Sequence, residues 1–135
     1  MRHADEQAID CVYTIIAPER LDRAVRDNKS LHEKTRWVMA ERLTLKGRRL
    51  AVIFADAREC EKLLAWGMLT NIRVHENGTE FGVGKLYRLG ALKRTRLTVA
   101  STGEPIPDAH IRPYVLCKVP EVLEELNERP VPWSE

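Results

Sequence analysis

The chain has 135 residues, of which 44% are hydrophobic and 31% are charged, with a formal net charge of +2 at pH 7. This length suits one domain that buries its own core, and the composition excludes a disordered or membrane-embedded chain. The longest apolar stretches are too short to cross a bilayer, and charges occupy the N-terminus where a secretory signal needs an apolar core. We therefore expect a single cytoplasmic domain, with a core over about residues 9–119 and an acidic helix and tail over residues 120–135.

The first predicted elements are a strand and a helix. Residues 9–17 are rich in β-branched and aromatic residues, which favours a largely buried strand. Pro18 ends this strand, and apolar residues then recur at helical spacing as far as Asn28, which suits a helix C-terminus. A short helix is therefore expected over residues 18–27.

The next segment leads to the strongest strand pattern in the chain. Ser30 and Glu33 have the spacing of a capping box, although residues 35–39 favour an extended conformation soon afterwards. Residues 46–47, Lys-Gly, indicate a turn, and residues 49–55 behind them form an almost continuous apolar run. We expect this run to be a central strand of the core.

A helix and a hairpin are predicted next. Asp56 is a suitable N-cap for a helix over residues 57–66, in which apolar residues fall on one side. Residues 68–74 alternate as a strand, and the His-Glu-Asn-Gly reversal at residues 75–78 leads into a second strand over residues 79–83. This reversal is the strongest hairpin pattern present.

The remaining elements are shorter. Residues 86–89 continue the edge of the sheet, and residues 91–110 contain too much proline and glycine for regular structure beyond a strand near residues 97–100. Residues 111–119 return to strand character, and an acidic helix is expected over residues 120–127.

Cysteine and histidine spacing gives no support to a metal, cofactor or disulfide site. The three cysteines, Cys11, Cys60 and Cys117, are widely spaced, with no Cys-x-x-Cys pair and no histidine at ligand spacing. His3, His32, His75 and His110 are scattered, without an acidic or nucleophilic partner nearby in the sequence. We expect no metal and no cofactor.

The charge is unevenly distributed. Residues 119–135 carry a net charge of −4, which leaves +6 on residues 1–118. Two basic clusters contain Arg36, Arg42, Lys46, Arg48, Arg49 and Arg58, and Lys85, Arg88, Lys93, Arg94 and Arg96. Such clusters suit a polyanion, but an ordinary solvated surface carries the same residues, so both interpretations stay open.

The element order does not alternate regularly enough for a doubly wound parallel sheet, and an α+β fold with a mixed, curled sheet and peripheral helices fits it better. Residues 45–54 resemble the Lys-Gly-Asp-x-Val turn and strand of PUA-like barrels, the group that holds the ASCH, EVE and YTH domains, with Arg48 in place of the usual aspartate. Trp37 before this motif and Trp66 after it also match that group. The resemblance covers about residues 9–119 and implies a small β-barrel.

The resemblance also implies a pocket between the helix after the first strand and the central strands. Readers of modified bases stack aromatic side chains on the base, contact its edge with polar groups and bind phosphates with basic residues. The implied ligand-binding residues are Asn28, Ser30, Trp37, Phe54, Asp56 and Trp66. In this interpretation Trp37 and Trp66 sandwich a base of RNA or DNA, Ser30 and Asp56 contact its edge, and Arg36, Arg42 and Arg49 contact phosphates.

Three alternatives remain open. Trp37 and Trp66 can instead be core side chains, with Asp56 serving only as a helix cap. Some ASCH domains are small amidohydrolases of acylated nucleosides, which implies a catalytic set of Lys34, Thr35 and Glu41. The chain can also be a plain interaction module whose basic surface meets a partner protein.

Overall fold

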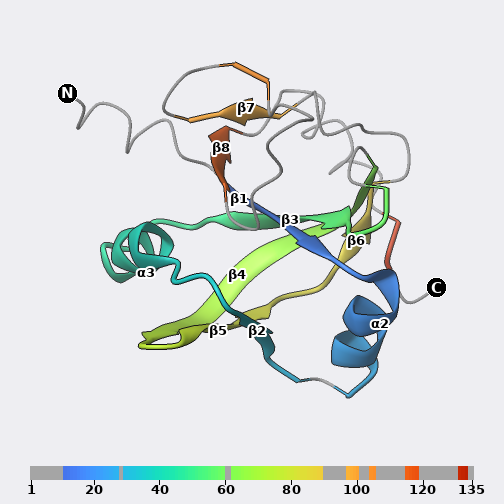
Figure 1. The fold of residues 1–135 in the computed structure, drawn as a ribbon, viewed down its shortest axis with the longest axis horizontal. Coiled ribbons are helices and arrows are strands. Elements are labelled where there is room, and N and C mark those ends of the chain that lie inside the picture. The colour runs from blue at the N-terminus through green and yellow to red at the C-terminus, as the bar shows by residue number, and fades with distance from the viewer. Residues whose placement is uncertain are drawn as a thin grey trace.

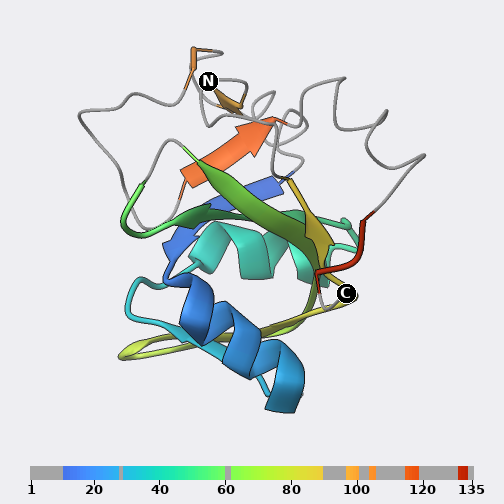
Figure 2. The same ribbon diagram turned by 90° about the vertical axis from the view of Figure 1, so that its right-hand side faces the viewer.

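The computed structural model describes residues 11–27, 29–59, 62–89, 97–100, 104–105, 115–118 and 131–133. These residues form a mixed α+β fold with one curled sheet, as the sequence predicts, and two helices accompany this sheet (Figure 1). The strand order is β2-β5-β4-β3-β1-β8-β7, and β6 pairs with β4 outside this path. The two helices, α2 and α3, lie at opposite ends of the curl (Figures 1 and 2).

The centre of the sheet is the parallel pair β1 (Cys11–Ile16) and β3 (Ala51–Asp56), which confirms the two strands expected there. Ala51 to Ala55 are all buried, because the sheet covers their backbone and side chains pack on both of its faces. A strand buried on both faces has a continuous apolar sequence rather than an alternating one.

The two faces of the sheet carry separate clusters of buried side chains. The helix-side cluster includes Val12, Ile16, Val52 and Phe54 from the central strands and reaches Leu21 of α2. The opposite-face cluster contains the alternate residues of the same strands, together with Leu63, Trp66, Leu89 and Leu97. Strand alternation therefore divides the core into two layers.

The first helix, α2 (Pro18–Asp27), has the predicted bounds. Its apolar side consists of Leu21, which is buried, and the partly buried Ala24 and Val25 at helical spacing. Asn28, the expected C-terminal stop, lies outside the described residues.

The segment after α2 differs from the prediction. A short strand, β2 (Leu31–Glu33), stands where a capping box was expected, and it pairs with β5 through Leu31 and Phe81. Trp37 then precedes a helix, α3 (Val38–Leu45), although residues 35–39 have β-type composition. The helix forms because Ala40 and Leu43 reach the helix-side cluster at helical spacing, and this packing outweighs local propensity.

The helix predicted over residues 57–66 is wrong. Within that range, residues 57–59 form a bend and the long strand β4 (Leu63–His75) begins at Leu63, paired antiparallel with β3. Asp56 still acts as a local cap, since its Oδ1 accepts hydrogen bonds from Arg58 N at 2.8 Å and Glu59 N at 3.4 Å. A capped turn therefore forms without a helix following it.

The predicted hairpin is confirmed. β4 turns at residues 76–77 into β5 (Gly78–Val83), and Gly78 has a φ of 149°, which glycine adopts most readily. A β-bulge lies between Thr70 and Arg73, where Asn71 has a φ of 48°. The predicted turn at residues 46–47 is also present, with Gly47 at a φ of 89°.

The C-terminal half adds short strands. β6 (Tyr87–Arg88) pairs with β4, and β7 (Thr98–Val99) pairs with β8 (Val115–Lys118), which in turn pairs with β1. The acidic helix expected over residues 120–127 and most of the loop over residues 91–110 lie outside the described residues, as does Cys60. In the described part of the chain no helix is long and apolar enough to span a membrane.

Candidate ligand-binding site

A cleft of about 870 Å³ lies where the curled sheet brings β2 round opposite the end of β1 without pairing the two strands. One wall consists of the end of β1, the start of α2 and Ala57 after β3. The other wall consists of β2, the residues that follow it and the β4–β5 hairpin. The polar side chains lining the cleft are Arg20, His32, Glu33, Lys34, Thr35, His75, Asn77 and Thr79.

Glu33 is the polar group most enclosed by this cleft. Leu31 is buried and His32 is exposed, so strand alternation directs Glu33 to the inner side of the sheet with Leu31. The Glu33 side chain is only 12% exposed. Its Oε1 atom is buried and has no hydrogen-bond partner among the described residues.

The charge environment of Glu33 is set by burial and by one cation. Burial raises the pKa of the Glu33 carboxyl, and the nearby Arg20 guanidinium partly opposes this rise. Arg20 Nη1 lies 3.8 Å from Glu33 Oε1, which is an ion-pair distance but too long for a hydrogen bond. Arg20 also donates a hydrogen bond to the backbone oxygen of His32, which holds α2 against β2.

The loop after β2 is fixed to the hairpin by hydrogen bonds. Thr79 Oγ1 donates to Thr35 O at 2.8 Å and accepts from Trp37 N at 2.8 Å. Arg36 Nε donates to His75 O at 2.9 Å. These bonds place exposed Lys34 and Arg36 beside the cleft, where cations can meet an anionic ligand.

Two histidines at the edge of the cleft share one carboxylate. Glu80 lies 3.8 Å from His32 Nε2 and 3.7 Å from His75 Nε2, because β5 runs between β2 and β4. No group of three or more histidine, cysteine or acidic side chains is arranged to hold a metal within the described residues.

The two tryptophans expected to sandwich a base are not brought together. Trp37 is 0% exposed and stacks on Phe81 with ring centroids 4.4 Å apart, in the helix-side cluster that also holds Phe54. Trp66 is 8% exposed and lies in the opposite-face cluster, 5.3 Å from the Tyr87 ring. The sheet separates the two indoles, so they do not wall one pocket and both pack as core residues.

The other expected ligand-binding residues are dispersed. Ser30 is exposed and lines a different groove, between α2 and β5, while Asp56 caps the turn after β3. Neither of these two side chains lines the cleft. Asn28 lies outside the described residues.

The expected phosphate contacts are all exposed but do not form one surface at the cleft. Arg36 is tied to the hairpin beside it, whereas Arg42 belongs to α3 and Arg49 precedes β3. Only Arg36 is thus placed near the cleft by a described contact.

The alternative catalytic set is partly assembled. Lys34 and Thr35 line the cleft, but Glu41 Oε2 accepts a hydrogen bond from Val74 N at 2.9 Å and does not line it. Glu33, which the sequence suggested only as a capping residue, lies in the cleft with Lys34 and Thr35. A Leu-His-Glu run that alternates inward and outward was the pattern that could have revealed it.

Comparison with protein-family models, curated proteins and solved structures found no match to this chain. Function therefore has to be inferred from the chemistry of the cleft.

Proposed function

We propose that this chain is a nucleic-acid-binding module of PUA-like architecture that takes a base or modified nucleotide into the cleft between β1 and β2. The observation that carries the proposal is Glu33, whose buried Oε1 atom has no hydrogen-bond partner in the described structure. A buried polar atom without a partner costs about 1–3 kcal/mol. A ligand that donates a hydrogen bond to this atom would remove that cost.

The edge of a base suits this carboxyl group. Glutamate accepts hydrogen bonds from exocyclic amino groups, and a protonated carboxyl can also donate one to a ring nitrogen or carbonyl. Burial raises the pKa of Glu33, which favours the protonated form relative to an exposed glutamate. Lys34 and Arg36 beside the cleft supply charge for a phosphate.

The PUA-like part of the proposal rests on element order and on one motif. The chain runs strand, helix, strand, helix and then into antiparallel strands that continue one curled sheet. The turn at residues 46–47 leads into the central strand β3, as in the motif that the sequence resembles. Glu33 replaces the tryptophan pair as the group expected to recognise the base.

Calorimetric titration with each common ribonucleoside monophosphate, and with short RNA and DNA oligonucleotides, tests this function. We expect Glu33→Gln to weaken base-dependent binding by about tenfold, because one hydrogen-bonded pair to a base edge contributes about 1–3 kcal/mol. Lys34→Ala should weaken binding equally for all bases and lower its dependence on salt.

Glu76→Gln is the matched control, since Glu76 is exposed in the hairpin turn and does not line the cleft. Failure of the unaltered protein to bind any nucleotide or oligonucleotide would contradict the proposal. So would a Glu33→Gln variant that binds every ligand as the parent does.

A second candidate function is supported by the presence of Glu33, Lys34 and Thr35 in one cleft. In hydrolysis of an N-acylated nucleoside, water adds to the acyl carbon, the C–N bond breaks, and the amine leaves with a proton supplied by a general acid. A carboxyl group with a raised pKa can transfer such protons. Incubation with a panel of N-acylated nucleosides should release free acid, and Lys34→Ala should abolish the release.

A further inference from the structure

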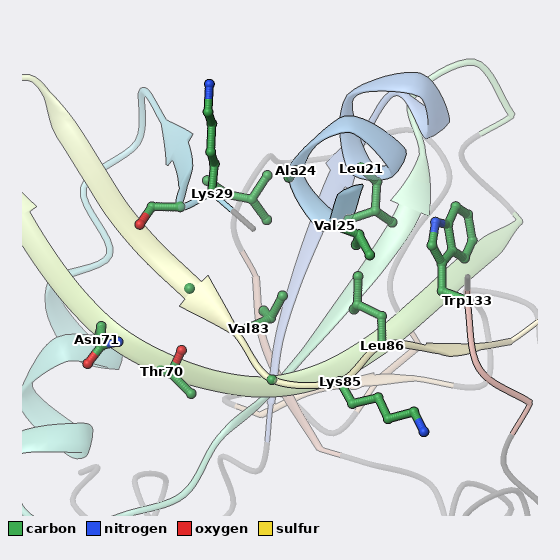
Figure 3. Close-up of a pocket in the computed structure, with 14 residues that line it drawn as sticks. Leu21, Ala24, Val25, Lys29, Thr70, Asn71, Val83, Lys85, Leu86 and Trp133 are labelled. Atoms are coloured by element: carbon green, nitrogen blue, oxygen red, sulfur yellow. The ribbon is translucent and has the colours of Figure 1, made fainter. Parts of the chain in front are cut away.

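A second concave surface, here called the α2–β5 groove, has a volume of about 550 Å³ and lies between helix α2 and the end of strand β5 (Figure 3). Its apolar lining includes Leu21, Ala24, Val25, Leu31, Val83, Leu86 and Trp133. Figure 3 shows Leu86 directed toward Leu21 and Val25 across the groove, with Trp133 at one end and Lys29 at the other. This groove shares no lining residue with the cleft that holds Glu33.

The groove exists because β5 is longer than the strand beside it. The pairing between β2 and β5 stops at Leu31 and Phe81, whereas β5 continues to Val83. Lys29 and Ser30, which come before β2 in the sequence, lead from α2 to this point, so β2 does not extend further along β5. The last residues of β5 therefore have β4 on one side and no paired strand on the other side in the described structure.

The backbone of Val83 faces this unpaired side. Gly84 N donates to Met68 O at 2.8 Å, and Leu69 N donates to Leu50 O at 2.9 Å, away from β5. Leu69 is the register partner of Val83, and pairs in an antiparallel ladder alternate between hydrogen-bonded and non-hydrogen-bonded. The N–H and C=O groups of Val83 consequently point away from β4 and toward the groove.

One end of the groove is closed and the other is open. At the closed end the backbone N–H of Trp133 donates to Leu86 O at 2.9 Å, and the indole Nε1 donates to Asp22 Oδ1 at 2.6 Å. Trp133 therefore connects the segment that follows β5 to helix α2. At the open end Lys29 is exposed. Lys29 and Lys85 are the charged residues among the described lining residues, and no carboxylate accompanies them. The Lys85 side chain extends away from α2, with its Nζ atom 5.8 Å from the centroid of the Tyr87 ring, so Lys29 carries the positive charge at the groove (Figure 3).

We propose that the α2–β5 groove binds an acidic peptide segment in an extended conformation, which adds to the edge of β5 at Val83. Such a segment pairs its backbone with the Val83 N–H and C=O groups, as peptides do when they extend a sheet. Its alternate apolar side chains contact Ala24 and Val25, which are only partly buried, and an acidic side chain at the open end meets Lys29. The positive charge of Lys29 selects against a basic segment.

The probe is a short synthetic peptide, Glu-Val-Thr-Val-Thr-Val-Glu, followed by amide NMR and hydrogen exchange on the full chain. Binding should slow exchange of the Val83 amide by about tenfold or more, because an added strand converts this N–H into a ladder donor. A peptide of the same sequence with alternate backbone nitrogens methylated cannot make those bonds and should not protect Val83. A peptide with lysine at both ends should bind more weakly.

Two variants locate the binding surface. Ala24→Arg places a long side chain in the groove from a partly buried position of α2 and should abolish binding, while Lys29→Glu should weaken it roughly fivefold. Arg26→Glu is the matched control, because Arg26 is an exposed cation of α2 that does not line the groove. Glu33→Gln should leave peptide binding unchanged, which separates this inference from the proposed nucleotide function.

Several results would overturn the inference. The inference is wrong if the peptide leaves the Val83 amide unprotected, or if it binds the Ala24→Arg variant as tightly as it binds the parent. Displacement of the peptide by a thymidine oligonucleotide that itself protects Val83 would assign the groove to nucleic acid. Protection of Val83 that rises with protein concentration without peptide would assign it to a second copy of this chain.

Discussion

Glu33 illustrates a conflict between stability and binding at a single side chain. Its carboxyl group is largely removed from water, and the Arg20 guanidinium, the cation paired with it in the described structure, lies 3.8 Å away. A cation at that distance offsets only part of the desolvation, since burial remains the larger influence on the pKa. Groups kept in such a position at the expense of stability are common in binding sites.

The first prediction follows from this conflict. Glu33→Gln should stabilise the free protein by about 1 kcal/mol at neutral pH, because burying a neutral amide costs less desolvation free energy than burying a carboxylate. Urea denaturation of both proteins measures the difference. The exposed Glu76→Gln variant should change the free energy of unfolding by less than about 0.5 kcal/mol.

The stability difference between Glu33→Gln and the parent should depend on pH, and the raised pKa of Glu33 fixes the sign of this dependence. Because the pKa of Glu33 is raised above its usual 4.5 in the folded protein, both states are protonated below that value and ionisation adds no penalty. As the pH rises through 4.5 the unfolded chain ionises first, so the parent loses stability until the folded carboxyl has also ionised. The advantage of Glu33→Gln should therefore disappear below pH 4.5, and an advantage that is independent of pH would contradict this explanation.

Single residues were the hardest feature to assign from the sequence. Trp37 and Trp66 have the composition of an aromatic pocket, but a tryptophan pattern does not reveal which face of a sheet each ring occupies. The structure assigns them to opposite layers of the core. The sequence did not reveal the burial of Glu33, because this burial arises from the curl of the sheet and not from its sequence neighbours.

At the scale of elements, local sequence was sufficient where one pattern dominated. β1, α2, β3 and the β4–β5 hairpin were predicted, because apolar runs, helical spacing and the Asn-Gly turn each had one interpretation. The prediction failed at residues 57–66, where Leu-Leu-Ala-Trp suits a helix as well as a buried strand. Pairing with β3 on one side and β6 on the other decides for the strand.

Two glycines provide a matched test of how β2 is held to the hairpin. A Cβ atom at Gly78 would lie 2.1 Å from the Glu33 backbone oxygen, whereas one at Gly47 would meet nothing within 4 Å. Both residues have a positive φ, of 149° and 89°. Gly47→Ala should cost about 1 kcal/mol from backbone strain alone.

Gly78→Ala should cost more, about 3 kcal/mol or above, because the backbone of β2 must also move. Urea denaturation gives both values, and nucleotide titration should show that only Gly78→Ala disturbs the cleft, since Gly78 lines it and Gly47 does not. Equal losses of stability in the two variants would mean that the contact between the hairpin and β2 is dispensable.

At the scale of the whole molecule, chain segments far apart in sequence complete one structure. Residues 131–133 pack against β6, where Arg88 N donates to Val131 O at 2.8 Å and Tyr87 forms an isolated antiparallel β-bridge with Pro132. The Pro-Val-Pro-Trp segment at residues 130–133 has no periodicity from which this placement could be predicted. Its place is set by tertiary contacts with α2 and β6, which local patterns do not encode.

Trp133 is the anchor of this returning segment. It is 7% exposed, the Arg88 guanidinium lies 4.5 Å from its ring centroid, and Arg88 Nη2 donates to Trp133 O at 2.6 Å. Its indole nitrogen donates to Asp22 of α2. One side chain thus joins the helix-side cluster, a helix and a strand.

Trp133→Ala should therefore destabilise the protein by about 3 kcal/mol, in the range expected for removing a large buried aromatic side chain. Trp133→Phe retains an aromatic ring but loses the bond to Asp22, so it should cost less, about 1–2 kcal/mol. Val131→Ala, at a residue that is 55% exposed two positions earlier, should change stability by less than about 0.5 kcal/mol. If Trp133→Ala unfolds at the same urea concentration as Val131→Ala, the C-terminal segment contributes nothing to the folded body, and Trp133 does not close the α2–β5 groove.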